Sequence, residues 1–435
     1  MSKRCKSGDS FYHRLFRTEP VPQDLSGIAD IDHAAEVKPA KADLSPEAVA
    51  RIRDAFEALY RAGVYPMLSL CLRRSGEIVL NRSLGYSRDD KVASLDTPIC
   101  LFSASKAVTA ILMHLLAQQG KINLLHPVSH YLPAFAAKGK GSITVLQLLT
   151  HRSGIAKIPE GTELDLLYDH DTALAMICDA ASTDPHARVQ GYHALTSGFI
   201  FNELIKITTG LDAQQYLHRY ISKPMGMRYF RFGLNKRDQA HVAMNKATGM
   251  DIALINRALA SVLGATPDTA VDMTNDPRFY DAIIPSANLY ATAEEVSRFY
   301  QMLLNHGQWE GVRILDPLTV HQATRPLGGF QLDRSLMLPM RYSAGFMLGG
   351  SPVGIYGRDT QYAFGHLGYA NIMCWADPQR DIAVSLMNTG KPVIGPHMKS
   401  LLMLMNAISE ACEPVFDMTA DTPFYMQDRV AHLER

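Results

Sequence analysis

The sequence has few cysteines, no net charge and no long apolar run, and each absence narrows the possible functions. Its six cysteines are scattered without a C-x-x-C pair, which argues against a structural zinc site and a dense disulfide framework. The 43 basic and 43 acidic residues cancel, so charge gives no reason to expect nucleic acid or an anionic membrane as the principal partner. No apolar stretch is long enough to span a bilayer.

Common motifs of other enzyme classes are also missing. The chain has no G-x-S-x-G nucleophile elbow, which disfavours an α/β-hydrolase triad. It has no H-E-x-x-H, P-loop or G-x-G-x-x-G segment, so we expect no metal and no cofactor. The basic start Met1-Ser-Lys-Arg-Cys-Lys6 continues into polar residues instead of the apolar region of a signal peptide. We therefore expect a cytoplasmic protein with reduced thiols.

The pattern of apolar residues predicts an α+β fold. Ser45-Pro-Glu-Ala48 is a typical helix start, and this helix is expected to end near Arg61. Met67 to Arg73 and Ile78 to Leu84 have the composition and spacing of a β-hairpin. Further strands are expected at 342–348, 372–376 and 382–387. Further helices are expected at 103–119, 143–150, 164–181, 195–209, 212–221, 293–305 and 397–411.

The order of these elements predicts an antiparallel sheet flanked by helices and built from both ends of the chain, with a mostly helical part inserted between them. We expect an irregular N-terminal extension at 1–44, one main domain at 45–412 and a C-terminal tail at 413–435. Within the main domain, the sheet part is expected at about 45–102 and 306–412. The helical part is expected at about 103–305.

The segment Phe102-Ser103-Ala-Ser-Lys106 joins strand-like sequence to helical sequence and can carry chemistry. Residues i and i+3 share a helix face, so the Lys106 amine can reach the Ser103 hydroxyl. Serine needs a base to take its proton before it attacks, and burial near a positive helix end lowers the pKa of a lysine. The Ser103 N–H can also stabilise an oxyanion. Alone, this short motif favours a plain helix cap with a solvated lysine.

Four further segments accompany this motif in a fixed order. They are Lys121-Ile-Asn-Leu-Leu-His-Pro-Val-Ser-His-Tyr-Leu-Pro133, Ile143-Thr-Val-Leu-Gln-Leu-Leu-Thr-His-Arg-Ser-Gly-Ile155, Pro285-Ser-Ala-Asn-Leu-Tyr-Ala-Thr-Ala-Glu-Glu-Val296 and Gly365-His-Leu-Gly368. With Ser103 and Lys106 they resemble the serine β-lactamase-like superfamily, which includes penicillin-binding proteins, class C β-lactamases and family VIII carboxylesterases. The resemblance covers about residues 45–410 and implies the β-lactamase/transpeptidase-like fold.

The resemblance also implies roles for residues elsewhere in the chain. Tyr192 matches the tyrosine of the family's Tyr-x-Asn motif and is implied to relay protons as a general acid or base. Ala194 replaces the asparagine of that motif, and alanine cannot hydrogen-bond the acylamino group of a β-lactam or peptide. His366 and Gly368 are implied to line the substrate pocket, with His366 near a substrate carboxylate or the Tyr192 oxygen. The Tyr369 N–H is implied to be the second oxyanion donor.

Two classes of function remain. The first is a serine hydrolase. Within it, carboxylesterase on a small-molecule ester leads, because Ala194 offers no amide, followed by β-lactamase or D-amino-acid peptidase and then acyltransferase. The second is a non-catalytic binding or assembly protein of the same fold. The joint presence of the serine, the lysine, the tyrosine and the G-H-x-G segment argues against this second class. The oligomeric state does not follow from these patterns.

Overall fold

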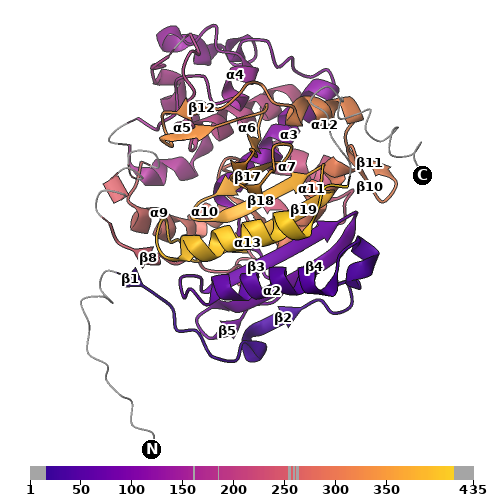
Figure 1. The fold of residues 1–435 in the computed structure, drawn as a ribbon. Helices are drawn as coiled ribbons and strands as arrows, with labels where there is room; N and C mark the ends of the chain where they lie inside the picture. Colours follow the sequence, from indigo (N-terminus) through magenta and orange to yellow (C-terminus); the bar gives the residue numbers. More distant parts are fainter. Residues whose placement is uncertain are drawn as a thin grey trace, which may run out of the picture.

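One antiparallel sheet organises the chain (Figure 1). The computed structural model describes residues 16–159, 162–184, 186–252, 256–257, 260 and 264–415, and eight strands of this part form the sheet. The strand order is β14 (Met347–Leu348), β17 (Phe364–Gly368), β18 (Ile372–Asp377), β19 (Ile382–Asn388), β3 (Met67–Arg74), β4 (Glu77–Arg88) and β2 (Ala29–Ile31), and β5 (Lys91–Val92) also pairs with β4. The expected α+β class is confirmed.

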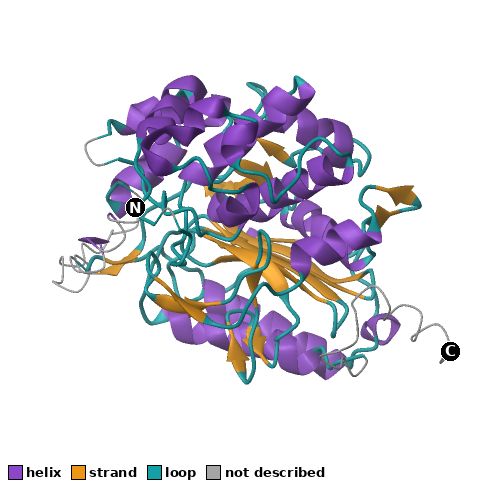
Figure 2. Cartoon of the chain, turned by 90° about the horizontal axis from the view of Figure 1, so that it is seen from above, coloured by secondary structure: helices purple, strands orange, loops and turns teal. Residues whose placement is uncertain are grey.

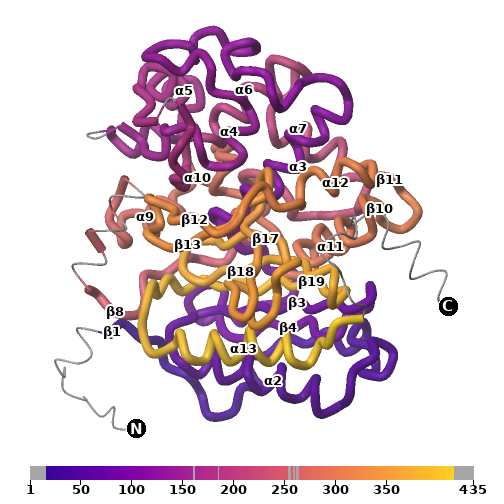
Figure 3. Tube along the Cα trace, turned by 45° about the horizontal axis from the view of Figure 1, so that its top comes forward, coloured from indigo at the N-terminus to yellow at the C-terminus, as the bar shows by residue number. Residues whose placement is uncertain are grey.

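Strands from distant parts of the sequence meet at the centre of the sheet. β19 pairs with β3 in a register that runs from Ile382↔Arg74 to Asn388↔Leu68. Figure 3 accordingly shows the indigo and yellow parts of the trace side by side. The predicted hairpin is also confirmed, because β3 and β4 pair across a turn at Ser75 and Gly76. Both turn residues have positive φ angles of 51° and 82°, as a two-residue hairpin turn requires.

Alternate residues of the central strands enter two separate cores, because successive side chains of a strand point to opposite faces. In β3, Leu68, Leu70 and Leu72 belong to one core, whereas Met67 and Cys71 belong to the other. Both faces are therefore covered. The continuous apolar character of these strands, in place of a polar and apolar alternation, follows from that double burial.

Helices cover both faces of the sheet, as Figure 2 shows. α2 (Pro46–Tyr60) and α13 (His397–Ala411) pack together on one face, and α11 (Ala293–Leu304) packs on the other against β3, β18 and β19. The predicted start of α2 is confirmed, since Ser45 Oγ accepts a hydrogen bond from the Ala48 N–H at 3.1 Å. Such an N-cap stabilises a helix by about 1 kcal/mol.

Most of the other helices form a layer above α11 and the sheet (Figure 1). They are α3 (Ser105–Gln118), α4 (Val145–Leu149), α5 (His170–Asp179), α6 (Thr196–Thr209), α7 (Ala213–Leu217) and α12 (Pro317–Thr324), whereas α9 (Pro267–Thr274) and α10 (Pro277–Asp281) lie at the side of the molecule, level with the sheet. At the centre of this layer, α3 is buried on all sides from Ser105 to Leu116. Most of its side chains are apolar, and a helix with apolar side chains on every face requires such an environment. The division into a sheet part and a helical part stays a prediction.

Smaller strands complete the fold. They are β6 (Ile99–Cys100), β7 (Arg231–Phe232) and β9 (Leu289–Ala291) in a three-stranded sheet, and the pairs β1 (Phe16–Arg17) with β8 (Gly249–Met250), β10 (Gln308–Trp309) with β11 (Val312–Arg313), β12 (Gln331–Asp333) with β13 (Leu338–Met340), and β15 (Val353–Gly354) with β16 (Gly357–Arg358). Because β6 pairs with β9, the segment before Ser103 lies next to the segment that contains Pro285.

Several local expectations are wrong. The patterns predict an irregular segment up to residue 44, but β2 pairs with β4 over Ala29–Ile31. A strand of three residues is too short to show an alternation, yet it covers an otherwise open sheet edge. The strand expected at 342–348 is reduced to β14, because the chain turns at Gly345 with a φ of 123°. Residues 1–15 of the expected extension and 416–435 of the expected tail lie outside the described residues.

Candidate active site

Ser103 lies at a sharp turn between β6 and the buried helix α3. The turn is a single 3-10 segment, η3 (Phe102–Ala104), which leads directly into α3. Phe102 has a φ of 49°, a left-handed conformation that is uncommon for a bulky residue and is found where the surroundings fix it. Ser103 therefore sits at the positive end of the α3 dipole.

Three oxygen atoms surround the Lys106 amine. Nζ lies 3.2 Å from Ser103 Oγ, 2.6 Å from the carbonyl oxygen of Ala194 and 2.9 Å from the carbonyl oxygen of Ser286. Carbonyl oxygens only accept, so they take two N–H bonds and the third position of the amine faces the Ser103 hydroxyl. Burial lowers the pKa of Lys106 well below its usual value. When the amine is neutral, its lone pair points to Ser103 Oγ, as a general base requires.

Tyr192 contacts both Ser103 and Lys106. Against the larger effect of burial, the Ser103 side chain lowers the pKa of the Tyr192 hydroxyl, and Lys106 Nζ lies 5.0 Å from the centre of the Tyr192 ring. Its backbone N–H donates to Oδ1 of the buried Asp333 at 3.1 Å. Burial raises the pKa of Tyr192, so the phenol stays protonated at neutral pH.

The segment around Ser286 holds the helices near Lys106 together. Thr109 Oγ1 donates to the Pro285 carbonyl at 2.6 Å, and Ser286 Oγ donates to the Leu195 carbonyl at 2.7 Å. A Cβ atom on Gly198 would lie 2.2 Å from Ser286 Oγ, so only glycine allows α6 to approach this closely. The sequence analysis assigns no role to Ser286, although its carbonyl oxygen is one of the atoms that fix Lys106.

His366 is buried on β17 beside Tyr192. The two ring centres are 6.0 Å apart. His366 Nδ1 lies 2.7 Å from the Leu367 carbonyl oxygen, whereas Nε2 has no hydrogen-bond partner among the residues that the structure describes. Burial, together with the nearby Lys106, lowers the pKa of His366 to about 3. The imidazole is therefore neutral at pH 7 and offers no positive charge to a substrate carboxylate.

The end of β17 comes close to the turn that carries Ser103. A Cβ atom on Gly368 would lie 2.4 Å from the Leu101 carbonyl oxygen, so the glycine permits a backbone approach that other residues would block. The Tyr369 ring packs on Phe102 with 5.7 Å between the ring centres. Gly368, Tyr369 and Ser103 line one cavity. The oxyanion role of the Ser103 and Tyr369 N–H groups stays a prediction.

A cavity of about 380 Å³ opens over Ser103 and Tyr192. Of the described residues that line it, none is charged, and most are aliphatic or aromatic. The apolar lining residues are Phe102, Leu164, Leu167, Ala194, Leu195, Ala265, Ala270, Met273, Phe279, Ala287, Leu336, Leu338, Met340, Met347, Ile355, Leu367, Ala370 and Val393. The volume falls in the usual range of small-molecule sites.

The family model described as Beta-lactamase matches residues 52–400 of this chain. The chain belongs to the beta-lactamase family. It is 30% identical over 310 residues to the "Esterase/beta-lactamase LipL" of Mycobacterium tuberculosis, an alignment that covers 68% of this chain and 70% of the relative. The chain is thus a member of a family of serine hydrolases.

Two solved structures are similar to this beta-lactamase-family protein. A penicillin-binding protein homologue from Caulobacter crescentus is 25% identical with a TM-score of 0.74, over 85% of this chain and 98% of the other. A family VIII carboxylesterase is 26% identical with a TM-score of 0.72, over 83% of this chain and 97% of the other. The expected membership of the serine β-lactamase-like superfamily and the expected fold are confirmed.

The beta-lactamase-family site brings together the residues that the sequence singled out and adds others. Ser103, Lys106, Tyr192 and His366 form one cluster, and Ala194 presents its methyl group to the cavity. The sequence analysis missed Asp333, whose Oδ2 accepts from the Tyr342 hydroxyl at 3.0 Å while Oδ1 accepts from the Tyr192 N–H. It also assigned no function to the histidines beside Tyr192. A carboxylate on a two-stranded hairpin gives no sequence signal, because only the fold shows what it contacts.

In the described part of this beta-lactamase-family chain, no group of three or more histidine, cysteine, aspartate or glutamate residues has the arrangement of a metal site. None of its helices combines the length and apolar character needed to cross a bilayer.

Proposed function

We propose that this protein is a carboxylesterase that hydrolyses neutral, apolar esters through an acyl-enzyme on Ser103. The cavity over Ser103 carries the proposal: its described walls are apolar and uncharged. Burying a carboxylate there without a partner would be costly. An apolar acyl or alcohol group would instead gain about 25 cal/mol for each Å² of its surface removed from water. The similarity to a family VIII carboxylesterase supports the same choice.

The proposed acylation uses three side chains. Neutral Lys106 takes the proton of Ser103 while Oγ bonds to the ester carbonyl carbon. The N–H groups of Ser103 and Tyr369 stabilise the oxyanion that forms. Collapse of this intermediate breaks the bond to the alkoxide, and the neutral phenol of Tyr192 protonates the alkoxide as it leaves. The proton held by Lys106 replaces the one that Tyr192 gives.

Deacylation repeats these steps with water. A water molecule attacks the acyl carbon, its proton passes to the base formed by Lys106 and Tyr192, and Ser103 Oγ leaves with a proton. Among the described residues, His366 keeps an unpartnered Nε2 near Tyr192 in this scheme. The resemblance implied that His366 lines the substrate pocket, but this buried residue is not among those that border the cavity. We assign to it a role in packing against Tyr192, with a neutral ring whose Nδ1 is engaged.

The surface next to the cavity also suits apolar substrates. Leu338 lines the cavity while 56% of its surface remains exposed. Phe330, Leu332 and Met337 are exposed on the same β12–β13 hairpin or beside it. A gathering of exposed apolar side chains is uncommon unless it serves binding. We infer that an ester reaches Ser103 across this apolar rim.

β-Lactamase activity is the second candidate, because the relative LipL is named as both an esterase and a beta-lactamase. A cephalosporin, however, carries a carboxylate, and no described residue of the cavity wall carries a positive charge. We expect cephalosporin turnover to be at least about 100-fold slower than ester turnover, which corresponds to about 2.7 kcal/mol in the barrier.

The test compares p-nitrophenyl butyrate with a chromogenic cephalosporin, using the wild type, Ser103→Ala and Ser129→Ala. Ser129 is half-buried, donates to the Gly141 carbonyl at 2.7 Å and does not line the cavity, so it is a matched control. We expect Ser103→Ala to lose about 10⁴-fold in kcat/KM and Ser129→Ala to keep its activity. A fluorophosphonate ester should phosphonylate Ser103 Oγ with loss of fluoride and of the hydroxyl proton, which adds the mass of the phosphonyl group less one hydrogen. Comparable rates on both substrates would overturn the ester preference, and full activity of Ser103→Ala would overturn the nucleophile.

A further inference from the structure

Three buried side chains beside Tyr192 form a hydrogen-bonded chain that the proposed mechanism does not use. His151 follows α4, Ser153 lies two residues later, and His193 stands between Tyr192 and Ala194. His151 Nδ1 lies 3.1 Å from His193 Nδ1, and His193 Nε2 lies 2.5 Å from Ser153 Oγ. His151 is 6% exposed, and Ser153 and His193 are each 0% exposed.

The contacts fix the tautomer of both histidines. His151 Nδ1 accepts a hydrogen bond from the backbone N–H of His193 at 3.2 Å, so this nitrogen carries no proton. Because His151 Nδ1 has no proton, the contact between the two Nδ1 atoms is favourable only if His193 Nδ1 carries a proton and donates it. His193 Nε2 is therefore an acceptor, and Ser153 donates its hydroxyl proton to it. The remaining proton of His151 lies on Nε2.

Both rings are neutral in this arrangement, and their surroundings require it. His151 packs against Tyr192 and Tyr342 at 4.7 Å and 5.0 Å between ring centres. Lys106 and His366 also face these histidines, and burial lowers the pKa of His193 to about 3. Asp333 reaches the cluster only through the Tyr192 N–H and the Tyr342 hydroxyl. A proton added to His151 Nδ1 would break its contact with His193 Nδ1, and a proton added to His193 Nε2 would make Ser153 accept where it now donates.

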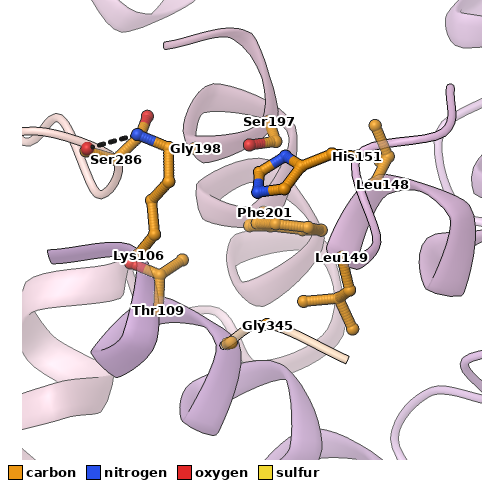
Figure 4. A pocket seen from close by; sticks show the side chains of 11 residues that line it. Lys106, Thr109, Leu148, Leu149, His151, Ser197, Gly198, Phe201, Ser286 and Gly345 are labelled. Atoms are coloured by element: carbon orange, nitrogen blue, oxygen red, sulfur yellow. Dashed lines mark hydrogen bonds between the residues drawn. The ribbon is translucent and has the colours of Figure 1, made fainter. Parts of the chain in front are cut away.

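One member of this hydrogen-bonded chain, His151, lies across a small cavity from Lys106 (Figure 4). The His151 ring and the Lys106 side chain project from opposite sides into a small cavity of about 10 Å³, which Thr109, Ser197 and Ser286 also line. This volume admits about one water molecule. Displacement of the His151 imidazole would enlarge this space and let more water reach the Lys106 amine. His193 does not line the space, but its hydrogen bond to His151 holds that imidazole in place.

His193 lies between two residues that contact the catalytic pair, so its hydrogen bonds also affect Ser103 and Lys106. Its preceding neighbour, Tyr192, lines the cavity together with Ser103, and its following neighbour, Ala194, accepts a hydrogen bond from Lys106 Nζ at 2.6 Å. Holding the His193 side chain at both nitrogens therefore fixes the backbone between the two groups that orient Ser103 and Lys106. A misplacement of about 1 Å in such groups costs about 10²-fold in rate.

We propose that His193, held by His151 and Ser153, is a positioning residue for proton transfer at Ser103. The proposal rests on the proposed function, since it assigns His193 to the reaction of Ser103. The neutral chain keeps the Tyr192 hydroxyl and the Ala194 carbonyl in place and keeps water away from Lys106. His193 does not line the substrate cavity, so its loss acts on kcat and leaves KM nearly unchanged.

The test measures kcat, KM and the pH dependence of kcat with p-nitrophenyl butyrate for His193→Ala, His193→Asn and His193→Gln. His193→Ala should lose about 10²-fold in kcat and change KM less than about 3-fold. Water that enters beside Lys106 raises the pKa of the amine towards its usual value, so the acidic limb of the profile should move to higher pH. Asparagine can replace the donor at Nδ1 and glutamine the acceptor at Nε2, so both variants should recover part of the rate.

His114→Gln is the matched control, because His114 is also buried but bonds through Nε2 to the Ala344 carbonyl at 2.9 Å. It should lower the melting temperature and leave the pH limb unchanged. If His193→Ala fails to fold, Ser153→Ala tests the same chain by removing one donor, with a smaller loss of about 3- to 10-fold that Ser153→Thr should restore. A kcat and a pH limb equal to the wild type in His193→Ala, or in Ser153→Ala, would overturn the proposal.

The outcome separates this inference from the proposed function. Labelling of wild-type Ser103 by the fluorophosphonate ester tests the nucleophile alone. If the wild type is labelled and the His193 variants are labelled at the same rate, the positioning role is wrong while the nucleophile stands. If the wild type is neither labelled nor active on the ester, the proposed function is wrong.

Discussion

The two sides of the Ser103–Tyr192 pair differ in chemistry. On the cavity side the walls are apolar and carry no charge among the described residues. On the inner side Lys106 and the histidine chain have directional partners for nearly every polar atom. We infer from this difference that the cavity side selects the substrate by shape and polarity and that the inner side transfers protons. Substitutions on the two sides should therefore change different kinetic constants.

The largest expected effect comes from the inner side. Lys106→Gln keeps a chain of similar length but removes the basic amine, so kcat should fall by about 10³- to 10⁵-fold. KM should change little, because Lys106 does not line the apolar cavity. Stopped-flow measurement of ester turnover would show the loss. More than a tenth of the wild-type rate in a folded Lys106→Gln variant would mean that another group takes the Ser103 proton.

A negatively charged ester should test whether the cavity side selects neutral substrates. The wild type should prefer p-nitrophenyl butyrate over the carboxylate-bearing p-nitrophenyl hemisuccinate by about 10²-fold in kcat/KM, since the carboxylate loses its water without gaining a partner. Met340→Arg, which adds a cation to the wall, should narrow this ratio. Equal rates of the wild type on both esters would show that the cavity does not select by charge.

Lowering the pH should reduce the stability of the fold, because buried histidines lie on the inner side of the site. Burial lowers the pKa values of His193 and His366 to about 3, whereas both histidines have pKa values of about 6.5 in the unfolded chain. Between these pH values the unfolded chain binds more protons than the folded chain, so the free energy of unfolding rises with pH. The contribution of these histidines to that free energy is lost as the pH falls from about 6.5 towards 3. Each such histidine contributes up to about 1.4 kcal/mol per pH unit.

Urea unfolding at pH 7, 6 and 5 measures this dependence. His366→Gln should show a shallower loss than the wild type, because one titrating group is absent. His33→Gln is the comparison variant, since His33 is exposed. Identical slopes for His366→Gln and the wild type would contradict the neutral, buried state of His366.

The smallest effect is expected at the border between the two sides. Ala194→Asn restores an amide where the family motif carries one and places it on the apolar wall. Ester turnover should fall by about 3- to 10-fold, because a polar group is added without a built partner. Cephalosporin turnover should rise in the same assay. A rise in both activities would show that the wall tolerates polarity better than its composition suggests.

The sequence predicted the parts of this molecule whose pattern is local. The β3–β4 hairpin, α2 and the Ser103–Lys106 pair all follow from spacing and capping within a few residues. The family resemblance predicted the fold and the gathering of Tyr192 and His366 at Ser103. The contacts of His193 and Asp333 could not be predicted, because each depends on a partner more than 40 residues away whose position only the packed chain defines.

The pairing of β3 with β19 has a consequence for how the chain reaches its native state. The centre of the sheet joins residues more than 300 positions apart, so a ribosome must release nearly the whole polypeptide before the central strands can meet. Closing such long loops comes late and is slow. In the meantime β3 and β4 expose an edge with apolar side chains on both faces, which invites association with other chains. We therefore expect the yield of native protein to depend on chaperones and on slow synthesis.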